Sequence, residues 1–390
     1  MNQKISNYGL RVRSNGDNEL DLLLVSVIAL IPFLPFILSG AFLAVVWAAL
    51  LVINRTRRAV FEQKHMFVLN VLISGLSLLS SLISGNVIGM LISFGVFVLL
   101  TVGCYLMSVM TASLFNRVTL ITSAASIPVA VVAALQQIIE KNPAYLPSAQ
   151  AFNPNYLGSI AALSAVFAMI RFFERDEKSS NGRTRNTEKA LYLLSFLACC
   201  VTILATQSRS SLLALMLCVL AYIFLTKHYV LFAVALVGGI GLWVIGWFKP
   251  ELFSWSNSLI EVFTVRYEIW QDAFKSFSQN AYTALIGRGP MSYYHVRETE
   301  GLALHDHAHN IFLDTLINVG VIGAVLYVLL LLVFVRRMLH NRKAHDNTAF
   351  LFVAIALIEI FVQGIPDVTI MWHQTAPLFL LGCSAVCTQK

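Results

Sequence analysis

Long apolar runs alternate with short polar segments along most of the chain. A helix that crosses a membrane needs about 20 mainly apolar residues. Twelve runs come near this length, at residues 20–36, 39–54, 66–84, 87–109, 117–137, 157–173, 190–206, 210–226, 229–248, 311–335, 348–365 and 375–389. The pattern predicts an all-α polytopic membrane protein with about twelve transmembrane helices, in a single integral membrane domain that covers residues 1–390.

Two of the polar segments are longer than the others. Residues 141–155 contain three Pro, which is typical of an irregular loop. Residues 249–310 form the longest polar segment, and apolar side chains recur in it at three- and four-residue steps from Leu259 to Phe277. This spacing predicts an amphipathic helix that lies on the membrane surface or against the bundle.

Composition supports a membrane protein and excludes several other classes. Hydrophobic residues make up 58% of the chain and charged residues 12%, whereas soluble domains carry about 25% charged residues. The net charge of +7 comes from short basic runs between apolar spans, so it does not indicate a nucleic-acid partner. The six cysteines lie within or at the ends of apolar runs, which indicates neither a disulfide framework nor a cysteine zinc site.

The distribution of lysine and arginine predicts the orientation, because these residues concentrate in cytoplasmic segments. A cytoplasmic N-terminus places 20 of the 27 Lys and Arg residues on the inner side. Five of the remaining seven lie in the segment 249–310. We therefore expect both termini in the cytoplasm and 249–310 as one long loop on the outer side.

Three arginines on this outer side are candidates for binding an anion. Arg209 lies in a short turn between two spans, Arg266 on the apolar side of the amphipathic helix, and Arg288 between two glycines that would allow close approach to a ligand. Guanidinium groups bind phosphate oxygens bidentately, so three that converge would form a diphosphate clamp. The alternative for each is anchoring at the membrane interface.

Three histidines alternate before the apolar run 311–335. His305, His307 and His309 would point to one side of an extended segment, where they would bind zinc. The alternative for His305 and His307 is solvated loop side chains in a wet cavity. We favour this alternative and expect no metal site.

His309 differs from the other two because it directly precedes an apolar helix. The positive end of a helix dipole disfavours an imidazolium and attracts anions. A neutral imidazole beside a phosphate site is suited to act as a general base. The alternative is a histidine that only caps the helix.

Amide and carboxyl side chains form a polar stripe after His309. Asn310, Asp314 and Asn318 repeat at four-residue steps, so they share one face of the helix, which must point to the bundle interior or to water. We expect Asn310 and Asp314 to support the site. Glu359 is a second intramembrane carboxyl, and either acid would otherwise be a protonated packing residue. Asp367, in the last outer turn, would pair with an arginine or belong to the turn.

The order of these residues resembles a known family. The pattern His309-Asn310-x9-Gly320-x2-Gly323, after a long outer loop, resembles the O-antigen ligase and polymerase superfamily of bacterial inner-membrane glycan transferases. The two glycines would allow close helix contact.

Two further patterns contribute to the resemblance. Arg209-x3-Leu213 looks like a second signature of the family. Arg266, with Tyr267 and Trp270, resembles the arginine helix in the large loop of the family. Together the matching patterns cover the chain from about residue 200.

The resemblance implies a specific reaction. An O-antigen ligase takes a glycan from undecaprenyl diphosphate and attaches it to a sugar hydroxyl of lipid A–core in lipopolysaccharide biosynthesis, without nucleotide, metal or other cofactor. His309 would deprotonate or orient the acceptor hydroxyl, and Arg209 and Arg266 would bind the diphosphate. The assignment of Arg288 to diphosphate binding has less support from the family pattern and rests mainly on its position between two glycines. With one base and no carboxylate nucleophile, the transfer would invert the anomeric carbon.

The resemblance also implies a location and partners. We expect a multi-pass protein of the bacterial inner membrane with 249–310 as a periplasmic loop and the active site on the periplasmic side. The partners would be the two lipid substrates and membrane lipids, with no nucleic acid.

Two alternatives to an O-antigen ligase remain open. An O-antigen polymerase often carries an arginine-x10-glycine pattern, which is absent at Arg209, Arg266, Arg288 and Arg297. Related protein-glycosylating transferases often have an extra C-terminal region, whereas this chain stops right after its last span. Both absences favour a ligase. A twelve-span lipid or solute transporter would instead depend on its intramembrane carboxyls more than on His309.

Overall fold

Helices form all the regular secondary structure in the computed structural model, which describes residues 19–140, 153–174, 182–248, 256–302, 305–343 and 347–385. In chain order they are α1 (Glu19–Leu30), η1 (Ile31–Phe33), α2 (Phe36–Val52), α3 (Asn54–Glu62), α4 (Lys64–Ile83), α5 (Val87–Val109), α6 (Ala112–Glu140), α7 (Pro154–Phe173), α8 (Gly182–Thr206), α9 (Arg209–Leu225), α10 (Tyr229–Phe248), α11 (Ser256–Phe277), α12 (Ala281–Ile286), α13 (Ser292–Val296), α14 (Ile311–Lys343), α15 (Asn347–Gly364), η3 (Thr369–Met371) and α16 (Ala376–Cys383).

The all-helical class is confirmed within these ranges, but the count of twelve spans is not. Seven described helices are long and apolar enough to cross a membrane, or up to eight if α2 and α3, bent by 93°, form one span. Each predicted run overlaps a helix, but several of these helices are short. The helix α1 has only 12 residues and α16 only 8, fewer than the roughly 20 that a membrane crossing needs.

The main apolar core lies around α7 and α15. In the most apolar 18-residue stretch of α7, 89% of the residues are buried, and in that of α15 72% are buried. The corresponding share in α14 is 28%. Phe352 of α15 packs between Phe115 and Phe167, with ring centroids 4.7 and 5.1 Å apart. The helices at the centre are therefore shielded by protein, whereas the outer helices keep apolar side chains exposed, as expected for contact with lipid.

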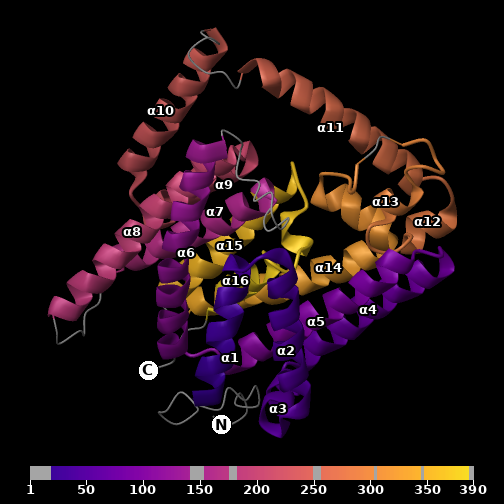
Figure 1. Cartoon of the computed structure of the whole chain (residues 1–390), viewed down its shortest axis with the longest axis horizontal. Coiled ribbons are helices and arrows are strands. Elements are labelled where there is room, and N and C mark those ends of the chain that lie inside the picture. The colour runs from indigo at the N-terminus through magenta and orange to yellow at the C-terminus, as the bar shows by residue number, and fades with distance from the viewer. Residues whose placement is uncertain are drawn as a thin grey trace, which may run out of the picture.

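The predicted amphipathic helix is present as α11, and it begins three residues earlier than the spacing indicated. Its Ile269 and Ala273 are buried in a second apolar cluster with Tyr293 of α13 and Ile317 of α14. In Figure 1, α11 crosses the top of the molecule and leads to α12 and α13 at one side. The described part of the long loop is therefore largely helical and packs on the first turns of α14.

The helix α14 contains a sharp kink at Gly320, where φ is 64° and ψ is −172°. The kink frees backbone carbonyls of the preceding turn, and these accept hydrogen bonds from the loop after α12. The amide of Arg288 donates to the carbonyl of Ile317 (3.1 Å), and that of Gly289 to the carbonyl of Asn318 (2.7 Å). The kink therefore attaches the long loop to α14.

Glycine is required on both sides of this junction. A Cβ added at Gly320 would lie 2.3 Å from backbone atoms of Leu285, and one at Gly287 would lie 2.4 Å from the backbone of Asn318. The expected close helix contact at Gly320 is confirmed. At Gly289 the near neighbour is Ser81 of α4, so the glycines around Arg288 face neighbouring helices rather than a ligand.

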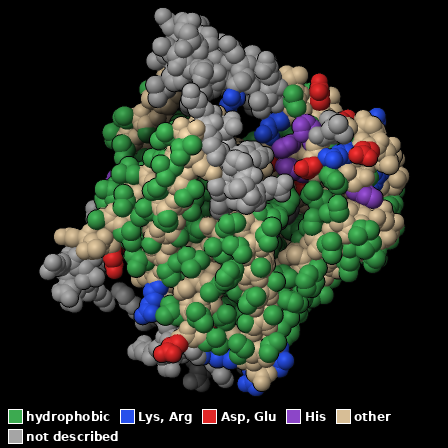
Figure 2. Space-filling view, viewed as in Figure 1, with side chains coloured by type: hydrophobic (Ala, Val, Ile, Leu, Met, Phe, Trp, Pro, Cys, Tyr) green, Lys and Arg blue, Asp and Glu red, His purple; other side chains and the backbone are tan. Residues whose placement is uncertain are grey.

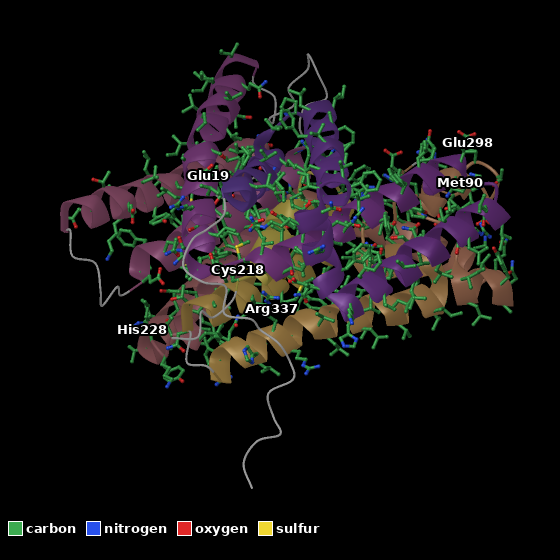
Figure 3. The ribbon with its side chains drawn as sticks, turned by 90° about the horizontal axis from the view of Figure 1, so that it is seen from below. Glu19, Met90, Cys218, His228, Glu298 and Arg337 are labelled. Carbon is green, nitrogen blue, oxygen red and sulfur yellow. The ribbon has the colours of Figure 1, made fainter. Side chains whose placement is uncertain are left out.

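Polar and apolar side chains occupy different parts of the surface. Figure 2 shows hydrophobic side chains over much of the visible face, with histidines gathered toward one end of it and charged groups at that end and at the bottom. The helix α3, which carries Arg55, Arg57 and Arg58, lies at the end opposite α11 in Figure 1. Seen from below, Cys218 and Arg337 lie within the bundle and Glu298 at its edge (Figure 3). The long loop and the arginine-rich helix are thus far apart.

Candidate functional site

The first turn of α14 positions His309. The side chain of Asn310 caps the helix, because its Oδ1 accepts hydrogen bonds from the amides of Phe312 (3.0 Å) and Leu313 (3.1 Å). His309 lies just outside this cap in the left-handed region, with φ 47°. A residue with a β-carbon is strained there, by about 1–3 kcal/mol, and such strain concentrates at functional sites. Asn310, not His309, is therefore the cap.

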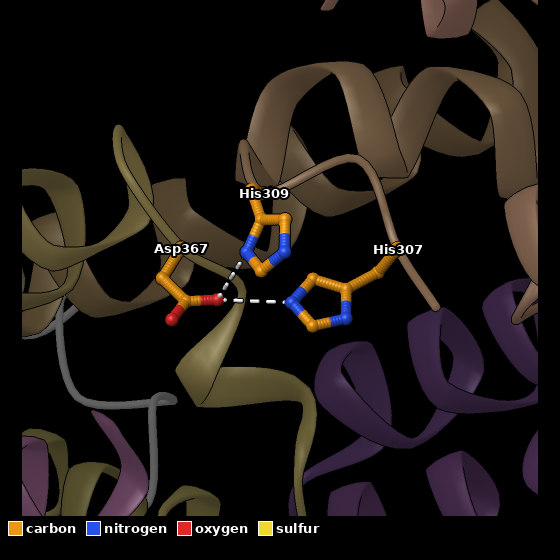
Figure 4. A group of neighbouring side chains, drawn as sticks. All are labelled: His307, His309 and Asp367. Carbon is orange, nitrogen blue, oxygen red and sulfur yellow. Dashed lines mark hydrogen bonds and ion pairs between the residues drawn. The ribbon is translucent and has the colours of Figure 1, made fainter. Parts of the chain in front are cut away.

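Asp367 joins two histidines of the long loop (Figure 4). Its Oδ1 lies 3.0 Å from Nε2 of His307 and 3.3 Å from Nδ1 of His309. The carboxylate comes from the turn between α15 and η3, and its side chain is only 2% exposed. Two segments that are far apart in the sequence therefore meet at one oxygen atom.

The electrostatics of this cluster favour a charged pair. Burial alone would raise the pKa of Asp367, but the hydrogen bonds and charges of His307 and His309 outweigh it and hold the pKa well below its usual range. Burial alone would lower the pKa of His307, but its bond to Asp367 and the charge of that carboxylate raise it overall. The reading of His307 as a solvated loop residue is therefore wrong.

His305 lies at the rim of the cluster. Its ring centroid is 5.6 Å from that of His309. Burial, followed by the nearby charges of His309 and His307, lowers the pKa of His305, so this imidazole stays neutral over a wider pH range. The guanidinium of Arg297 donates to the carbonyl of His305 (3.1 Å) and to Asp306 (2.8 Å), which fixes the path of the loop.

The second oxygen of Asp367 connects the cluster to the turn that carries Arg209. Asn155, at the start of α7, donates from Nδ2 to Oδ2 of Asp367 (2.6 Å). The hydroxyl of Ser208 in turn donates to Oδ1 of Asn155 (3.1 Å). Ser208 directly precedes Arg209, the exposed first residue of α9. Two hydrogen bonds therefore hold the Arg209 turn beside the histidines.

Arg266 approaches the cluster from α11. One helical turn further on, the indole of Trp270 donates to the carbonyl of His309 (3.4 Å), so this face of α11 lies against the site. One guanidinium nitrogen of Arg266 is buried and has no hydrogen-bond partner among the described residues. Burial lowers the pKa of Arg266, and the charge of Asp367 opposes the shift. The site therefore contains a cation with spare hydrogen-bonding capacity.

The structure does not bring Arg288 to this site. Its guanidinium forms an ion pair with Glu300 and donates a hydrogen bond to Gln279, both in the long loop. Of the three candidate arginines, Arg209 and Arg266 are therefore the two connected to the histidine cluster. The role of Arg288 in binding a diphosphate stays a prediction.

The polar stripe of α14 faces the protein interior. Asp314 accepts hydrogen bonds from the amide of Ala308 (3.2 Å) and from Nδ2 of Asn318 (2.7 Å). Asn318 also accepts from the hydroxyl of Ser292 at the start of α13 (2.7 Å). Asp314 and Asn318 are 5% and 9% exposed, which confirms the expected buried face. Their contacts hold the histidine loop and α13 against α14.

Asn310 and Glu359, the other two polar groups predicted from the sequence, lie in different surroundings. Asn310 donates to the carbonyl of Ile365 (3.1 Å), which ties the start of α14 to the turn that carries Asp367. Glu359 is buried in the bundle and accepts a hydrogen bond from Ser159 (2.9 Å). Asn310 therefore supports the cluster directly, whereas Glu359 belongs to the packing of α7 and α15.

Sequence reasoning missed several members of the cluster. It placed Asp367 with an arginine or in turn structure, did not single out Asn155, and treated His307 as solvent-exposed. The available signal was the alternation of His307 and His309, which does bring both side chains to one side. No pattern in the sequence connects Asn155 with Asp367, 212 residues away.

The arrangement combines three chemical capacities. It holds an imidazole oriented by a carboxylate, a guanidinium with unused donors, and an arginine on a tethered turn. Such a set can accept a proton and stabilise developing negative charge on a phosphate. The nitrogen and oxygen atoms of His307, His309 and Asp367 also lie within 4.8 Å of one another, close enough to hold a metal ion.

Comparison with known proteins gives one informative match. Residues 193–328 match a protein family described as O-antigen ligase. The matched segment includes Arg209, Arg266 and His309 but ends before Asp367 and begins after Asn155. No curated protein matches this chain.

Proposed function

Since residues 193–328 make the chain a member of the O-antigen ligase superfamily, we propose that it is an O-antigen ligase. It transfers O-polysaccharide from undecaprenyl diphosphate to a sugar hydroxyl of lipid A–core, as a multi-pass protein of the bacterial inner membrane. The reaction is a glycosyl transfer at the periplasmic face. The observation that carries the proposal is the pair of His309 and Asp367 beside the buried guanidinium of Arg266.

His309 is the general base of this proposal. With Nδ1 facing Asp367 at 3.3 Å, the neutral ring keeps its proton on Nδ1 and leaves Nε2 free to accept one. A carboxylate that fixes the tautomer and ring orientation of histidine is a recurring device of acid–base catalysis. The side chain of His309 is 21% exposed, so a substrate hydroxyl can reach it.

Arg266 and Arg209 bind the diphosphate in this proposal. Negative charge develops on the diphosphate as the glycosidic bond breaks, and guanidinium groups stabilise it by charge-assisted hydrogen bonds. The unused donor of Arg266 supports this role, and so does the tether of the Arg209 turn to Asp367 through Asn155. No nucleotide or metal is required by this scheme.

The proposed chemistry is one displacement. The hydroxyl oxygen of the acceptor attacks the anomeric carbon of the donor glycan, and the bond from that carbon to the diphosphate oxygen breaks. The hydroxyl proton passes to Nε2 of His309 and then to the departing diphosphate or to water. A single displacement inverts the anomeric carbon, and the site described above needs no covalent intermediate for it.

The position of the cluster suits substrates that are both lipids. His309 and Asn310 directly precede α14, a helix long and apolar enough to cross a membrane. A group at that point lies where a span meets the aqueous phase, within reach of a diphosphate at the membrane surface. Lys and Arg are in excess in the segments that are expected on the opposite side of the membrane. This excess supports the periplasmic assignment of the face that carries His309.

A reconstituted transfer assay tests the proposal. Purified full-length protein is mixed with undecaprenyl-diphosphate glycan and lipid A–core in the presence of EDTA, and lipopolysaccharide is resolved by electrophoretic mobility. We expect transfer by the wild type and a loss of at least about 100-fold in His309→Asn and Arg266→Ala. Asn tolerates the left-handed backbone of position 309, so that variant removes the base without adding strain.

His295→Ala is the matched control, because His295 lies in the same loop but bonds to the carbonyl of Ser84, away from the cluster. It should transfer at the wild-type rate. Elongation of the glycan on undecaprenyl diphosphate without transfer to core would identify a polymerase instead. Absence of both products from folded protein with authentic substrates would reject the transferase and favour the transporter.

A further inference from the structure

We propose that His307, His309 and Asp367 form an inhibitory binding site for a zinc-class divalent cation. The proposed reaction needs no metal, so this ion would act as a regulator rather than as a cofactor. Binding of the ion is independent of the proposed function, whereas the inhibition rests on it.

The spacing of the ligand atoms fits tetrahedral coordination. Zinc binds imidazole nitrogen and carboxylate oxygen at about 2.0–2.2 Å, which separates adjacent ligands of a tetrahedron by about 3.3–3.6 Å. The distances from Oδ1 of Asp367 to His307 Nε2 and His309 Nδ1 are 3.0 and 3.3 Å. All three ligand atoms lie within 4.8 Å of one another, so small side-chain shifts would bring them to this spacing.

The surroundings favour a cation at this place. Asp367 is buried and its second oxygen is held by Asn155 at 2.6 Å, the kind of outer contact that orients a metal-binding carboxylate. Asp314 adds a second carboxyl group near both histidines. The two imidazole rings lie 4.2 Å apart between centroids and turn their nitrogens to the same oxygen (Figure 4).

The ligand set selects among metals. Two imidazoles and one carboxylate suit zinc and similar transition ions, whereas magnesium prefers six oxygen ligands in octahedral geometry. The side chains of His307 and His309 are 12% and 21% exposed, which leaves a path for the ion and an open fourth position. Water or a phosphate oxygen would fill that position.

Occupancy would remove the proposed base. When a metal binds Nδ1 of a neutral imidazole, the proton of the ring resides on Nε2. His309 then has no free nitrogen that can accept the proton of the acceptor hydroxyl. Asp367 is engaged by the same ion and no longer orients the ring. Metal binding and proton transfer at His309 are therefore mutually exclusive.

Binding is tested on full-length protein in detergent, with zinc alone as the probe. Equilibrium dialysis followed by elemental analysis should give one tightly bound zinc per chain, and X-ray absorption at the zinc edge should show imidazole and oxygen ligands. His307→Gln and Asp367→Asn should each bind zinc at least about tenfold more weakly, and His295→Ala should bind as the wild type. Equal binding by all four proteins would overturn the site.

The test remains decisive if a variant does not fold, because the X-ray absorption spectrum of the wild type is sufficient. A bound zinc without imidazole ligands in the wild type would also reject the site. Inhibition is measured in the transfer assay. Zinc should abolish transfer in proportion to occupancy, EDTA should restore it, and magnesium at the same concentration should have no effect. Zinc that binds without inhibiting would overturn the inhibitory role.

Failure of the inference and failure of the proposed function give different results. Transfer in EDTA with no zinc bound at the cluster rejects only the inference. Zinc bound at the cluster in a protein that shows no transfer in EDTA rejects only the proposed function.

Discussion

At the scale of single residues, Asp367 has the most connected side chain of the candidate site. It bonds to His307 and His309 from the long loop and to Asn155 from the start of α7. Three segments therefore depend on one carboxylate for their relative positions. Replacing Asp367 would leave the imidazole of His309 in place but remove the group that orients it. The variant therefore tests orientation separately from the presence of the base.

We expect Asp367→Asn to lower kcat by about 100- to 10,000-fold with little change in KM, because the amide neither fixes the ring of His309 nor carries the charge that stabilises an imidazolium. Steady-state transfer kinetics measure both constants. Glu298→Gln is the matched control, since Glu298 is exposed in the same loop and lies at the edge of the molecule (Figure 3). A wild-type kcat in Asp367→Asn would show that His309 does not need this carboxylate.

The partners of Arg288 make a second prediction possible at this scale. The ion pair with Glu300 is partly buried, with side-chain exposures of 12% and 17%. If Arg288 serves mainly to hold the loop, Arg288→Ala and Glu300→Ala should lower thermal stability and transfer to a similar extent, and the double variant should add little. A loss of kcat in Arg288→Ala alone would instead restore its role at the diphosphate.

Residue-level prediction from sequence succeeds where the signal is local. His309 is identifiable because it stands directly before an apolar helix, and Arg266 because it repeats with Trp270 on one helix face. Asp367 and Asn155 are not identifiable in this way, because their partners lie 58 and 212 residues away along the chain. Only the packing of α7, α15 and the long loop brings them together.

At the scale of elements, α14 depends on the backbone of Gly320. Its φ of 64° and ψ of −172° belong to a region that is accessible essentially only to glycine. Gly320→Ala should therefore reduce the stability of the loop junction by at least about 2–3 kcal/mol, since strain and collision with Leu285 add together. Thermal unfolding in detergent and susceptibility of the long loop to proteolysis are the measurements.

Gly238→Ala is the control for this substitution. Gly238 is helical in α10, and an added Cβ would meet nothing within 4 Å. Alanine is a better helix former than glycine, so this variant should be neutral or slightly stabilising. Equal stability of Gly320→Ala and Gly238→Ala would contradict the requirement for glycine at the kink.

The sequence predicts the presence of helices better than the kinks and ends within apolar runs. The steps of apolar residues from Leu259 to Phe277 correctly predicted α11, because periodicity is a property of the helix itself. The apolar run 311–335 appeared continuous, since hydropathy does not register the backbone angles of Gly320. The count of twelve spans was not confirmed for a related reason: a run can be apolar while its described helix, as in α1, is too short to cross.

At the scale of the whole molecule, His373 links the turn before α16 to the start of α2. Its Nε2 lies 2.9 Å from the carbonyl of Phe36, and its ring packs edge-on against that of Phe36 at 4.3 Å. Burial lowers the pKa of His373 from 6.5, and the bond to the Phe36 carbonyl opposes this shift. The folded protein therefore favours the neutral ring.

The sign of the resulting pH effect follows from proton binding. Well above pH 6.5 the ring is neutral in both states and stability does not depend on it. As the pH falls below that value the unfolded chain takes up the proton first, so stability decreases by up to about 1.4 kcal/mol per pH unit. Thermal unfolding at pH 7.5 and 5.5 should show a smaller difference in His373→Gln than in the wild type. An identical difference would exclude this contribution.

The hydrogen bonds of Asp367 also bear on how such proteins exchange parts during evolution. The segment 193–328, by which the family is recognised, contributes His309 and both connected arginines, whereas Asn155 and Asp367 lie on either side of it. The recognised segment is therefore not a transferable module. A chimaera that imports this segment from a distant relative would inherit the proposed base without the groups that contact it, so we expect residues near 155 and 367 to be needed together with it.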